Sequence, residues 1–529
     1  MELYLLIVLP IFASLLLYLI PHRITTYLSI LLYGAVFFVT LHLFYRVRFL
    51  GETVSTHQED GFLGITLYCD RTAAVFLVLV AFLFLCMFLF TNVRERTSKL
   101  YSFLFTVLEG LIMLIFLSRD LFNIYVAVEV SAIVCAILIM FKRESRSIYD
   151  GLVYLLTNIT GMLFFLLGIG MLYRQTGVLD FDNIAAALPS CDPQALVLPF
   201  ALLMTGACLK CALFPMHFWL PLAHGTPGAP TEVSAILSGV YIKSGVYLFL
   251  RMHGLFSPVI DCSAFFFWAG VVTAIAGIVM AICQSDIKLI LAYHTVSQIG
   301  MIVAGLSFPG ETVQAGAMLH IMNHALFKSL LFLAAGMLIA RYGTRNIYEI
   351  RGVLRSAPLV GAAIIAGVLG ITGAPFFNGS ISKYFLAQAD TTLASFCFLV
   401  INFGTILSFV KFGRVLFGPK RDLDFRYDFS STAVIVTLSA LCLLTGIFAA
   451  PLLQLVLAVP LSISVSGYVN KVLVWAASFI LADLLYRKVI SRSQRIKAGI
   501  SLTLDFNSIV SCIGAGFLAL LAAALCAVW

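Results

Sequence analysis

The succession of long hydrophobic runs constrains the fold of this chain more than any other feature. About sixteen such runs follow one another, most of about 20 residues, which is the length that an α-helix needs to cross a bilayer. Of the 529 residues, 61% are hydrophobic and only 11% are charged, a composition too apolar for a water-soluble core. A membrane β-barrel would show shorter, alternating segments. We therefore predict an all-α polytopic membrane protein with about 14–16 transmembrane helices.

The boundaries of the hydrophobic runs define the predicted spans. No polar stretch between them exceeds roughly one long loop, so we expect no large soluble domain. The first run lacks an obvious cleavage site, and we expect it to remain as a helix of the mature chain. In chain order the predicted spans are 2–20, 27–45, 70–91, 100–117, 121–141, 150–173, 195–223, 231–250, 263–283, 287–307, 312–340, 358–388, 392–417, 431–456, 467–486 and 506–528.

Basic residues predict the orientation of these spans. Loops that follow even-numbered spans contain few of them, whereas cytoplasmic loops are typically rich in lysine and arginine. We therefore expect a multi-pass protein of the cell membrane with both termini on the non-cytoplasmic side. The net charge of +8 reflects this topology and does not require a nucleic-acid partner. The loops after odd-numbered spans contain Arg94, Arg96, Lys99, Lys142, Arg143, Arg146, Arg341, Arg345, Arg351, Arg355, Arg414, Lys420, Arg421, Arg426, Arg487, Lys488, Arg492, Arg495 and Lys497.

Several charged residues fall inside the predicted spans rather than in loops. Each central charge costs about 2.5–3.5 kcal/mol on insertion scales, so a set of them indicates a function. Lys411 lies near the end of its span, from which a long side chain could also reach the interface. The other charged residues of this kind are Glu109, Glu129, Lys210, Lys243, Lys328 and Lys383.

Two of these lysines lie beside a helix-breaking sequence. Lys210 precedes Pro215 by five residues, and Lys383 follows Pro375 and Gly379. Proline cannot donate a backbone hydrogen bond, and its ring opens the preceding turn. Irregular backbone inside a membrane is tolerated where it lines a polar cavity or is buried in protein. We therefore predict that the seventh and twelfth helices are discontinuous and that each break exposes a lysine to a polar path.

The paired breaks also predict the internal organisation of the chain. Interrupted helices at corresponding positions of two halves are typical of inverted repeats with sites near the middle of the membrane. We expect two inverted repeats of five helices each, flanked by additional helices at both ends. The predicted parts are the N-terminal helices in 1–99, the first repeat in 100–251, the second repeat in 263–417 and the C-terminal helices in 431–529.

Buried acids and lysines suggest exchange of protons between neighbouring groups. Glu129 could pair with Lys210 and hold it charged, and loss of that pair would release the proton. The alternative is that Lys210 is tied permanently to one fixed carboxylate. Glu109 is a second buried acid and could equally be a contact between helices.

The eleventh span carries His320, His324 and Lys328, spaced four residues apart and therefore on one helix face. Neutral histidines relay protons near physiological pH. A metal pair is the alternative, but no third histidine or carboxylate lies nearby in sequence. His294 is a weaker candidate that could simply hydrogen-bond between helices. The CxxC of Cys208 lies inside a predicted helix without a partner pair, and no nucleotide-binding motif is present.

Five blocks of the sequence resemble the antiporter-like subunits of the complex I superfamily. They are DLFNIYVAVEV, LKCALFPMHFWLPLAH, GAPTEVSAILSGVYIKSGVYLFLR, QSDIKLILAYHTVSQIGMIVAG and HIMNHALFKSLLFLAAG, within roughly 100–417. That superfamily includes NADH:quinone oxidoreductase, membrane-bound hydrogenases and Mrp-type cation/proton antiporters. The resemblance implies a fourteen-helix core and proton movement along a buried axis. It places on this axis Glu129, Lys210, Lys243, His320, His324, Lys328 and Lys383, with Lys243 linking two half-channels and Lys383 in the far one.

The resemblance also implies the setting in which the chain works. A subunit of this kind conducts protons, or exchanges them for sodium, together with other membrane subunits. It binds no cofactor and has no redox centre, since flavin and iron–sulfur clusters belong to partner subunits. Two departures from the family pattern are Leu222 in LPLAH, where an aspartate is frequent, and the Asn378-Gly379-Ser380 stretch before Lys383. The alternatives are an Mrp-type antiporter subunit without redox partners, a stand-alone secondary transporter and a subunit that only anchors its partners.

Overall fold

A computed structural model gives the arrangement of the helices and describes residues 2–20, 22–56, 66–92, 98–423, 428–457, 461–493, 496 and 504–529. Within these residues, fifteen helices are long and apolar enough to cross a membrane, and one shorter apolar helix joins them. The prediction of an all-α protein with about 14–16 spans is confirmed. Of the basic residues used to predict orientation, Arg94, Arg96, Arg426, Arg495 and Lys497 lie outside the described residues.

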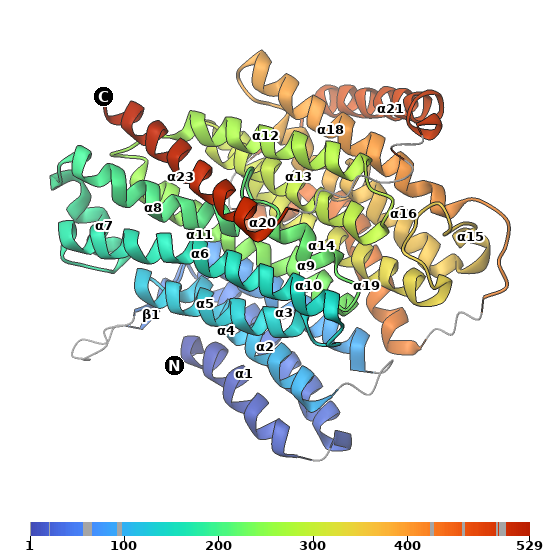
Figure 1. Ribbon diagram of the computed structural model, residues 1–529, viewed down its shortest axis with the longest axis horizontal. Helices are drawn as coiled ribbons and strands as arrows, with labels where there is room; N and C mark the ends of the chain where they lie inside the picture. Colours follow the sequence, from blue (N-terminus) through green and yellow to red (C-terminus); the bar gives the residue numbers. More distant parts are fainter. Residues whose placement is uncertain are drawn as a thin grey trace. The chain divides into compact units, whose positions relative to one another are not determined.

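The chain forms two compact units, and the first consists of Met1–Ile236, Val240–Cys262 and Leu504–Trp529. Helices α8 and α6 pack on each other, and the last helix, α23, packs on both (Figure 1). Its elements are α1 (Glu2–Leu19), α2 (His22–Phe49), β1 (Val54–Thr56), β2 (Leu67–Cys69), α3 (Arg71–Asn92), α4 (Lys99–Leu117), α5 (Leu121–Ile139), α6 (Ser145–Thr176), α7 (Phe181–Ala187), η1 (Leu188–Ser190), α8 (Pro193–Lys210), α9 (Trp219–Gly225), α10 (Thr231–Ile236), Val240 and Tyr241 of the turn after it, α11 (Ile242–Phe256) and α23 (Phe506–Val528).

The second unit consists of Leu237–Gly239 and Ser263–Thr503. The turn η2 (Leu237–Tyr241) is π-helical and is divided between the two units. The other elements of this unit are α12 (Ser263–Ile282), α13 (Ile287–Ser307), α14 (Glu311–Tyr342), α15 (Val353–Ser356), α16 (Pro358–Thr372), α17 (Gly379–Leu386), α18 (Thr392–Phe412), η3 (Gly413–Leu416), α19 (Phe429–Ile447), α20 (Ala449–Leu457), α21 (Val465–Lys488) and η4 (Ile490–Arg492).

Small residues allow the helices within each unit to approach closely. A Cβ atom added to Gly270 of α12 would lie 2.6 Å from the backbone of α13, and one added to Gly206 of α8 would lie 2.7 Å from Phe165 of α6. Helices in lipid associate through such close packing, because the hydrocarbon around them offers no hydrophobic driving force. The glycines in these runs therefore determine which helices pack as neighbours.

Short polar side chains begin many of the helices. Asp120 accepts a hydrogen bond from the backbone N–H of Asn123 at 2.7 Å at the start of α5, and Asp286 does the same for Lys288 at 2.8 Å at the start of α13. These N-caps satisfy donors that have no partner inside the helix. They explain why spans five and ten begin where the sequence predicts.

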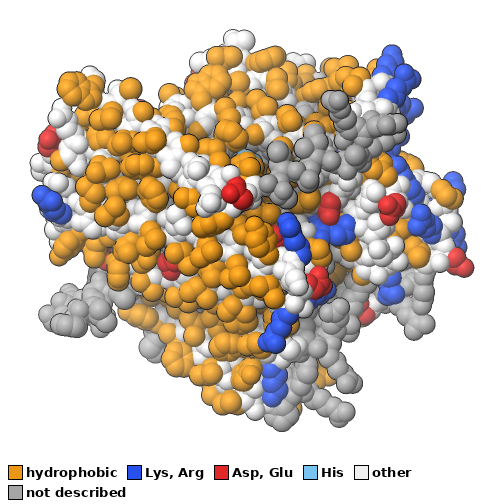
Figure 2. Space-filling model, viewed as in Figure 1, with side chains coloured by type: hydrophobic (Ala, Val, Ile, Leu, Met, Phe, Trp, Pro, Cys, Tyr) orange, Lys and Arg blue, Asp and Glu red, His pale blue; other side chains and the backbone are white. Residues whose placement is uncertain are grey.

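The outer surface of the helices is apolar. Leu163 and Leu167 of α6 and Leu473 and Ile480 of α21 are each more than half exposed. Hydrophobic side chains cover much of the face shown in Figure 2. Exposed apolar patches of this extent are unusual for a soluble monomer, whereas they suit contact with lipid or with neighbouring membrane subunits.

The structure differs from the expected grouping of the chain in two places. The fourteenth predicted span is divided at Phe448 into α19 and α20. The C-terminal part 431–529 is not one block, because α23 packs in the first unit, whereas α19 to α21 belong to the second. The inverted symmetry of the two repeats remains a prediction.

Candidate functional site

The seventh span is interrupted directly after Lys210. Helix α8 ends at this residue, and the backbone continues as turns to α9, with Ala212 in the left-handed region at φ 52°. The peptide bond before Pro215 is cis. The predicted discontinuity is confirmed, although the helix ends five residues before the proline. Lys210 is therefore the last helical residue before the irregular backbone.

The twelfth span is interrupted between α16 and α17. Gly373, at φ 73°, ends α16 with the left-handed residue that closes many helices, and the N–H of Ala374 donates to the carbonyl of Leu369 at 2.9 Å. Gly379 begins α17 in a position where a Cβ atom would lie 2.0 Å from the carbonyl oxygen of Gly370. Only glycine fits this approach, so the second predicted discontinuity is also confirmed and its tight backbone depends on Gly379.

Lys210 is buried among neutral acceptors. Its side chain is 3% exposed, and its Nζ donates to Oδ1 of Asn158 at 3.0 Å and to the hydroxyl of Tyr241 at 3.2 Å. The Tyr241 hydroxyl also lies 3.3 Å from the hydroxyl of Ser131, which is on α5 with Glu129. A hydrogen-bonded path therefore joins the break in α8 to the helix of the half-buried glutamate.

The expected ion pair between Glu129 and Lys210 is not formed. Among the ion pairs of the described residues none joins these two side chains, and Oε1 of Glu129 is buried without a hydrogen-bond partner. The sequence placed an acid on the correct neighbouring helix, but it could not show that Asn158 and Tyr241 take the direct contacts.

A π-helical turn places Tyr241 at this site. The turn η2 lies between α10 and α11 and adds one residue to the local repeat, which re-aims the side chains that follow it. Gly245, one turn later, allows α11 to approach α8, because a Cβ atom there would lie 2.5 Å from the carbonyl of Lys210. Lys243 lies between them in sequence and is 1% exposed. The site around Lys210 thus depends on backbone features of α11 as well as on the break in α8.

Helix α14 carries the predicted histidine and lysine face, and all three residues are buried. His320 lies 2.9 Å from the hydroxyl of Ser382 on α17 and 3.0 Å from Oε1 of Gln298 on α13, one through each ring nitrogen. The ring centres of His320 and His324 are 6.5 Å apart. Lys328 donates to the carbonyl of Leu291 at 2.5 Å. Within the described ranges no group of three or more metal-ligating side chains occurs, and His320 instead joins three helices by hydrogen bonds.

Lys383 reaches back from α17 to the end of α16. Its Nζ donates to the carbonyl of Ile371 at 2.6 Å and to Oδ1 of Asn402 on α18 at 2.8 Å. The last carbonyls of a helix have no partner inside it and carry the negative end of the helix dipole. The broken helix therefore supplies part of the stabilisation that a buried ammonium group needs.

Lys411 has a similar contact with a structural purpose. It is fully buried on α18 and donates to the carbonyl of Ile282 at 2.6 Å and to that of Gln284. Both carbonyls end or follow α12, so Lys411 caps that helix. The sequence left its role open, and these contacts are those of a capping residue.

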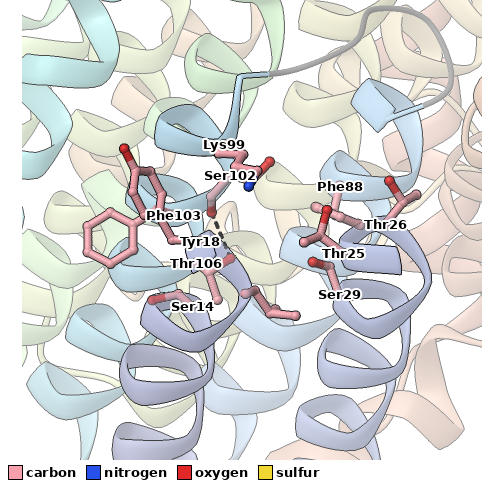
Figure 3. A pocket seen from close by; sticks show the side chains of 11 residues that line it. Ser14, Tyr18, Thr25, Thr26, Ser29, Phe88, Lys99, Ser102, Phe103 and Thr106 are labelled. Atoms are coloured by element: carbon pink, nitrogen blue, oxygen red, sulfur yellow. Dashed lines mark hydrogen bonds between the residues drawn. The ribbon is translucent and has the colours of Figure 1, made fainter. Parts of the chain in front are cut away.

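Glu109 is fully buried on α4, the helix that also contributes Ser102 and Thr106 to the lining of a small cavity. Neither of its carboxyl oxygens has a hydrogen-bond partner among the described residues. Thr106, one turn earlier on α4, hydrogen-bonds the Tyr33 hydroxyl at 2.8 Å and donates to the carbonyl of Ser102 at 2.8 Å. Figure 3 shows Thr106 and Ser102 among the residues that line the cavity, whose volume is about 20 Å³. Burial of an isolated charge is costly, and no donor of the described residues stabilises the Glu109 carboxylate.

Sequence analysis missed the neutral side-chain partners of Lys210, Lys383 and His320. Asn158, Tyr241, Gln298, Ser382 and Asn402 are the hydrogen-bonding residues that the structure adds. Their signal was an amide or hydroxyl inside an apolar run. That signal is weak by itself, because such residues often bond only within their own helix.

Comparison with known proteins identifies similar chains. The profile of the family described as "NADH:quinone oxidoreductase/Mrp antiporter, TM" matches residues 118–408. The chain is 33% identical over 368 residues to NADH-quinone oxidoreductase subunit N of Desulforudis audaxviator, covering 67% of this chain and 72% of that protein. It is 28% identical over 407 residues to a Na(+)/H(+) antiporter subunit of Alkalihalophilus pseudofirmus, covering 74% of this chain and 82% of that protein.

The fold is shared with a solved membrane complex. A chain of the membrane-bound sulfane sulfur reductase, an archaeal respiratory membrane complex, superposes with a TM-score of 0.80 at 21% identity. The match covers 91% of the present chain and 99% of that chain. At this identity the likeness concerns the fold, and it extends over nearly the full length of both chains.

Proposed function

Because the chain belongs to the NADH:quinone oxidoreductase/Mrp antiporter family of membrane proteins, we propose that it moves protons across the membrane as an antiporter-like subunit of a larger complex. The observation that carries this proposal is the pair of buried lysines at the two helix breaks. Lys210 and Lys383 each donate hydrogen bonds to neutral oxygen atoms only, in the contacts that the structure gives them. Each can therefore lose its proton without leaving a buried carboxylate unpaired.

The chemistry of lysine supports this role. A buried ammonium group is poorly solvated, and lysine changes its protonation state readily in such surroundings. Hydrogen bonds from neutral acceptors stabilise the charged form only partly. Charges also act on one another strongly where water is scarce, so a positive charge that arrives near Lys210 would favour release of its proton. The arrangement suits transfer in steps from one buried group to the next.

The proposed path uses the residues that the sequence identified. It begins at Glu129 and Lys210, continues through Lys243 and ends at Lys383. The proposed path also includes His320, His324 and Lys328, which share one face of α14. His320 is hydrogen-bonded through both ring nitrogens, to Ser382 and to Gln298, as a proton relay requires.

The setting of the subunit is proposed from its relatives. We favour a redox-driven complex in which partner subunits carry the flavin and iron–sulfur clusters, and this chain holds no redox centre. The alternative is an Mrp-type complex that exchanges sodium for protons without electron transfer, since relatives of both kinds are similar to the chain. The distribution of basic loops supports a non-cytoplasmic position for both termini.

Two experiments test the proposal. Mild solubilisation of native membranes and identification of the co-purifying subunits distinguishes the two settings, because only the first contains iron–sulfur or hydrogenase-like proteins. Proton uptake by everted vesicles that contain Lys383→Ala tests transport itself. We expect an assembled complex that does not pump, whereas assembly with full pumping would show that the chain only anchors its partners.

A further inference from the structure

A second lysine lies at the break of the twelfth span and was not among the predicted site residues. Lys471 is near the start of α21, a helix that is otherwise largely exposed. Its Nζ donates to the carbonyl of Gly373, the residue that ends α16, and to the hydroxyl of Ser380 on α17 at 2.5 Å. A lysine from a peripheral helix is thus inserted into the broken backbone.

Lys471 and Lys383 bind the same helix end. Lys383 donates to the carbonyl of Ile371, two residues before the carbonyl that accepts from Lys471. A Cβ atom on Gly373 would lie 3.1 Å from Cδ of Lys383. The alkyl chain of Lys383 therefore packs on Gly373, whose carbonyl accepts the hydrogen bond from Lys471. The C-terminal carbonyls of α16 therefore form one cation-binding end with two amines around it.

Two ammonium groups at one buried end repel each other. Lys383 and Lys471 bind carbonyls only two residues apart, those of Ile371 and Gly373, and no ion pair of the described residues joins either lysine to a carboxylate. When two like charges share a poorly solvated site, the second proton binds much more weakly than the first. Such a pair holds a single shared proton more readily than two.

Hydroxyl groups connect Lys471 to its surroundings. The Ser380 hydroxyl lies 3.0 Å from the hydroxyl of Tyr468, one turn before Lys471, and the Tyr468 hydroxyl accepts from the N–H of Phe376 at 3.4 Å. The ring of Tyr468 lies 5.7 Å from Nζ of Lys471. The irregular backbone, two hydroxyls and the amine form one polar cluster at the edge of the unit, against a largely exposed helix.

We propose that Lys471 and Lys383 together form a two-lysine proton site at the break of α16, with Lys471 as its outer member. A proton leaves when one N–H bond of the Lys383 ammonium group breaks and one N–H bond forms on the neutral amine of Lys471, so the charge of the pair stays constant. The assignment rests on the proposed proton transport, but the pairing itself can be tested separately. The rival reading makes Lys471 a permanently charged cap that fixes α21 to the break.

The first test measures the pairing without transport. The purified complex is acetylated with acetic anhydride at a series of pH values, and the extent of reaction at Lys471 is read by mass spectrometry. Other titratable groups on the packed elements are Tyr384 on α17, Tyr468 on α21 and Lys411 near the end of α18. Arg414 in η3 pairs with Asp483 farther along α21. Lys383→Met removes the like charge, so Lys471 should stay protonated, and resist acetylation, up to a pH at least about one unit higher than in the unchanged protein.

The second test measures transport. Everted vesicles are energised with NADH and, separately, with an imposed sodium gradient. We expect Lys471→Ala and Lys471→Arg to assemble and to pump at least about tenfold more slowly, because arginine keeps the charge but does not release its proton. Asn470→Ala is the matched control, an exposed neighbouring residue on the same helix, and should pump normally.

The outcomes separate the two proposals. Full pumping by Lys471→Arg, or an unchanged reaction profile of Lys471 in Lys383→Met, would overturn the two-lysine site in favour of a fixed cap. The acetylation profile of Lys471 could shift in Lys383→Met while the Lys210→Ala variant still pumps normally. That result would keep the lysine pair and reject the proposed transport path. A shifted profile with loss of pumping in both Lys471 variants supports the inference.

Discussion

Substitution of Tyr241 by phenylalanine tests how the site controls the charge of Lys210. The tyrosine hydroxyl is one of two acceptors for the ammonium group, and Asn158 is the other. Hydrogen bonds to charged groups contribute about 1.5–3 kcal/mol, and each 1.36 kcal/mol corresponds to a tenfold change in a proton equilibrium, so the charged form should lose a factor of about 10 to 150. At a fixed pH a correspondingly smaller fraction of Lys210 would carry a proton.

The assay is the rate of proton uptake by everted vesicles as a function of pH. We expect the pH–rate profile of Tyr241→Phe to move by about 1–2 units toward acid, because a more acidic medium is then needed to protonate the lysine. Tyr247→Phe, on the helix α11 that follows Tyr241, is a matched control. Its hydroxyl donates to the carbonyl of Phe116 at 2.8 Å and does not contact Lys210. The Tyr247→Phe control should reduce stability and leave the pH–rate profile unchanged. Identical pH–rate profiles for the two variants would refute the reasoning.

Three further substitutions follow from the contacts. Gly379→Ala should lower the thermal stability of the purified protein by roughly 1–3 kcal/mol and abolish pumping, since its Cβ would lie 2.0 Å from the carbonyl of Gly370. Lys411→Met should cost about 1–3 kcal/mol of stability, by loss of the α12 cap, while pumping by the remaining folded complex continues. Glu109→Gln should leave assembly and pumping unchanged within about 1 kcal/mol, because the carboxyl has no donor partners; loss of pumping with normal assembly would place Glu109 on the proton path.

The spans and the two breaks could be predicted from sequence because their causes are local. Run length and mean apolarity define a membrane helix, and Gly379 and Pro215 mark interruptions within a few residues. The end of α8 at Lys210, rather than at the proline, was not predictable. It depends on Gly245, which lies against the carbonyl of Lys210 although it is far away in sequence.

The partners of the buried lysines could not be predicted for the same reason. Asn158 is 52 residues from Lys210, and the carbonyls that Lys411 caps are 127 and 129 residues away. A charged residue in an apolar run indicates that a partner exists, but several acids, amides and carbonyls satisfy it equally well. This explains why Glu129 was the expected partner of Lys210, whereas Asn158 and Tyr241 accept its hydrogen bonds. It also explains why Lys471, near the beginning of its span, was passed over.

The central claim is that the lysine at the break of α8 carries protons, and proton uptake by everted vesicles that contain Lys210→Ala tests it most directly. The complex should assemble normally, because Lys210 is bound only by Asn158 and Tyr241 in the contacts that the structure gives, and both can bond elsewhere. The account predicts an assembled complex without proton uptake. An assembled complex that takes up protons at the normal rate would contradict it.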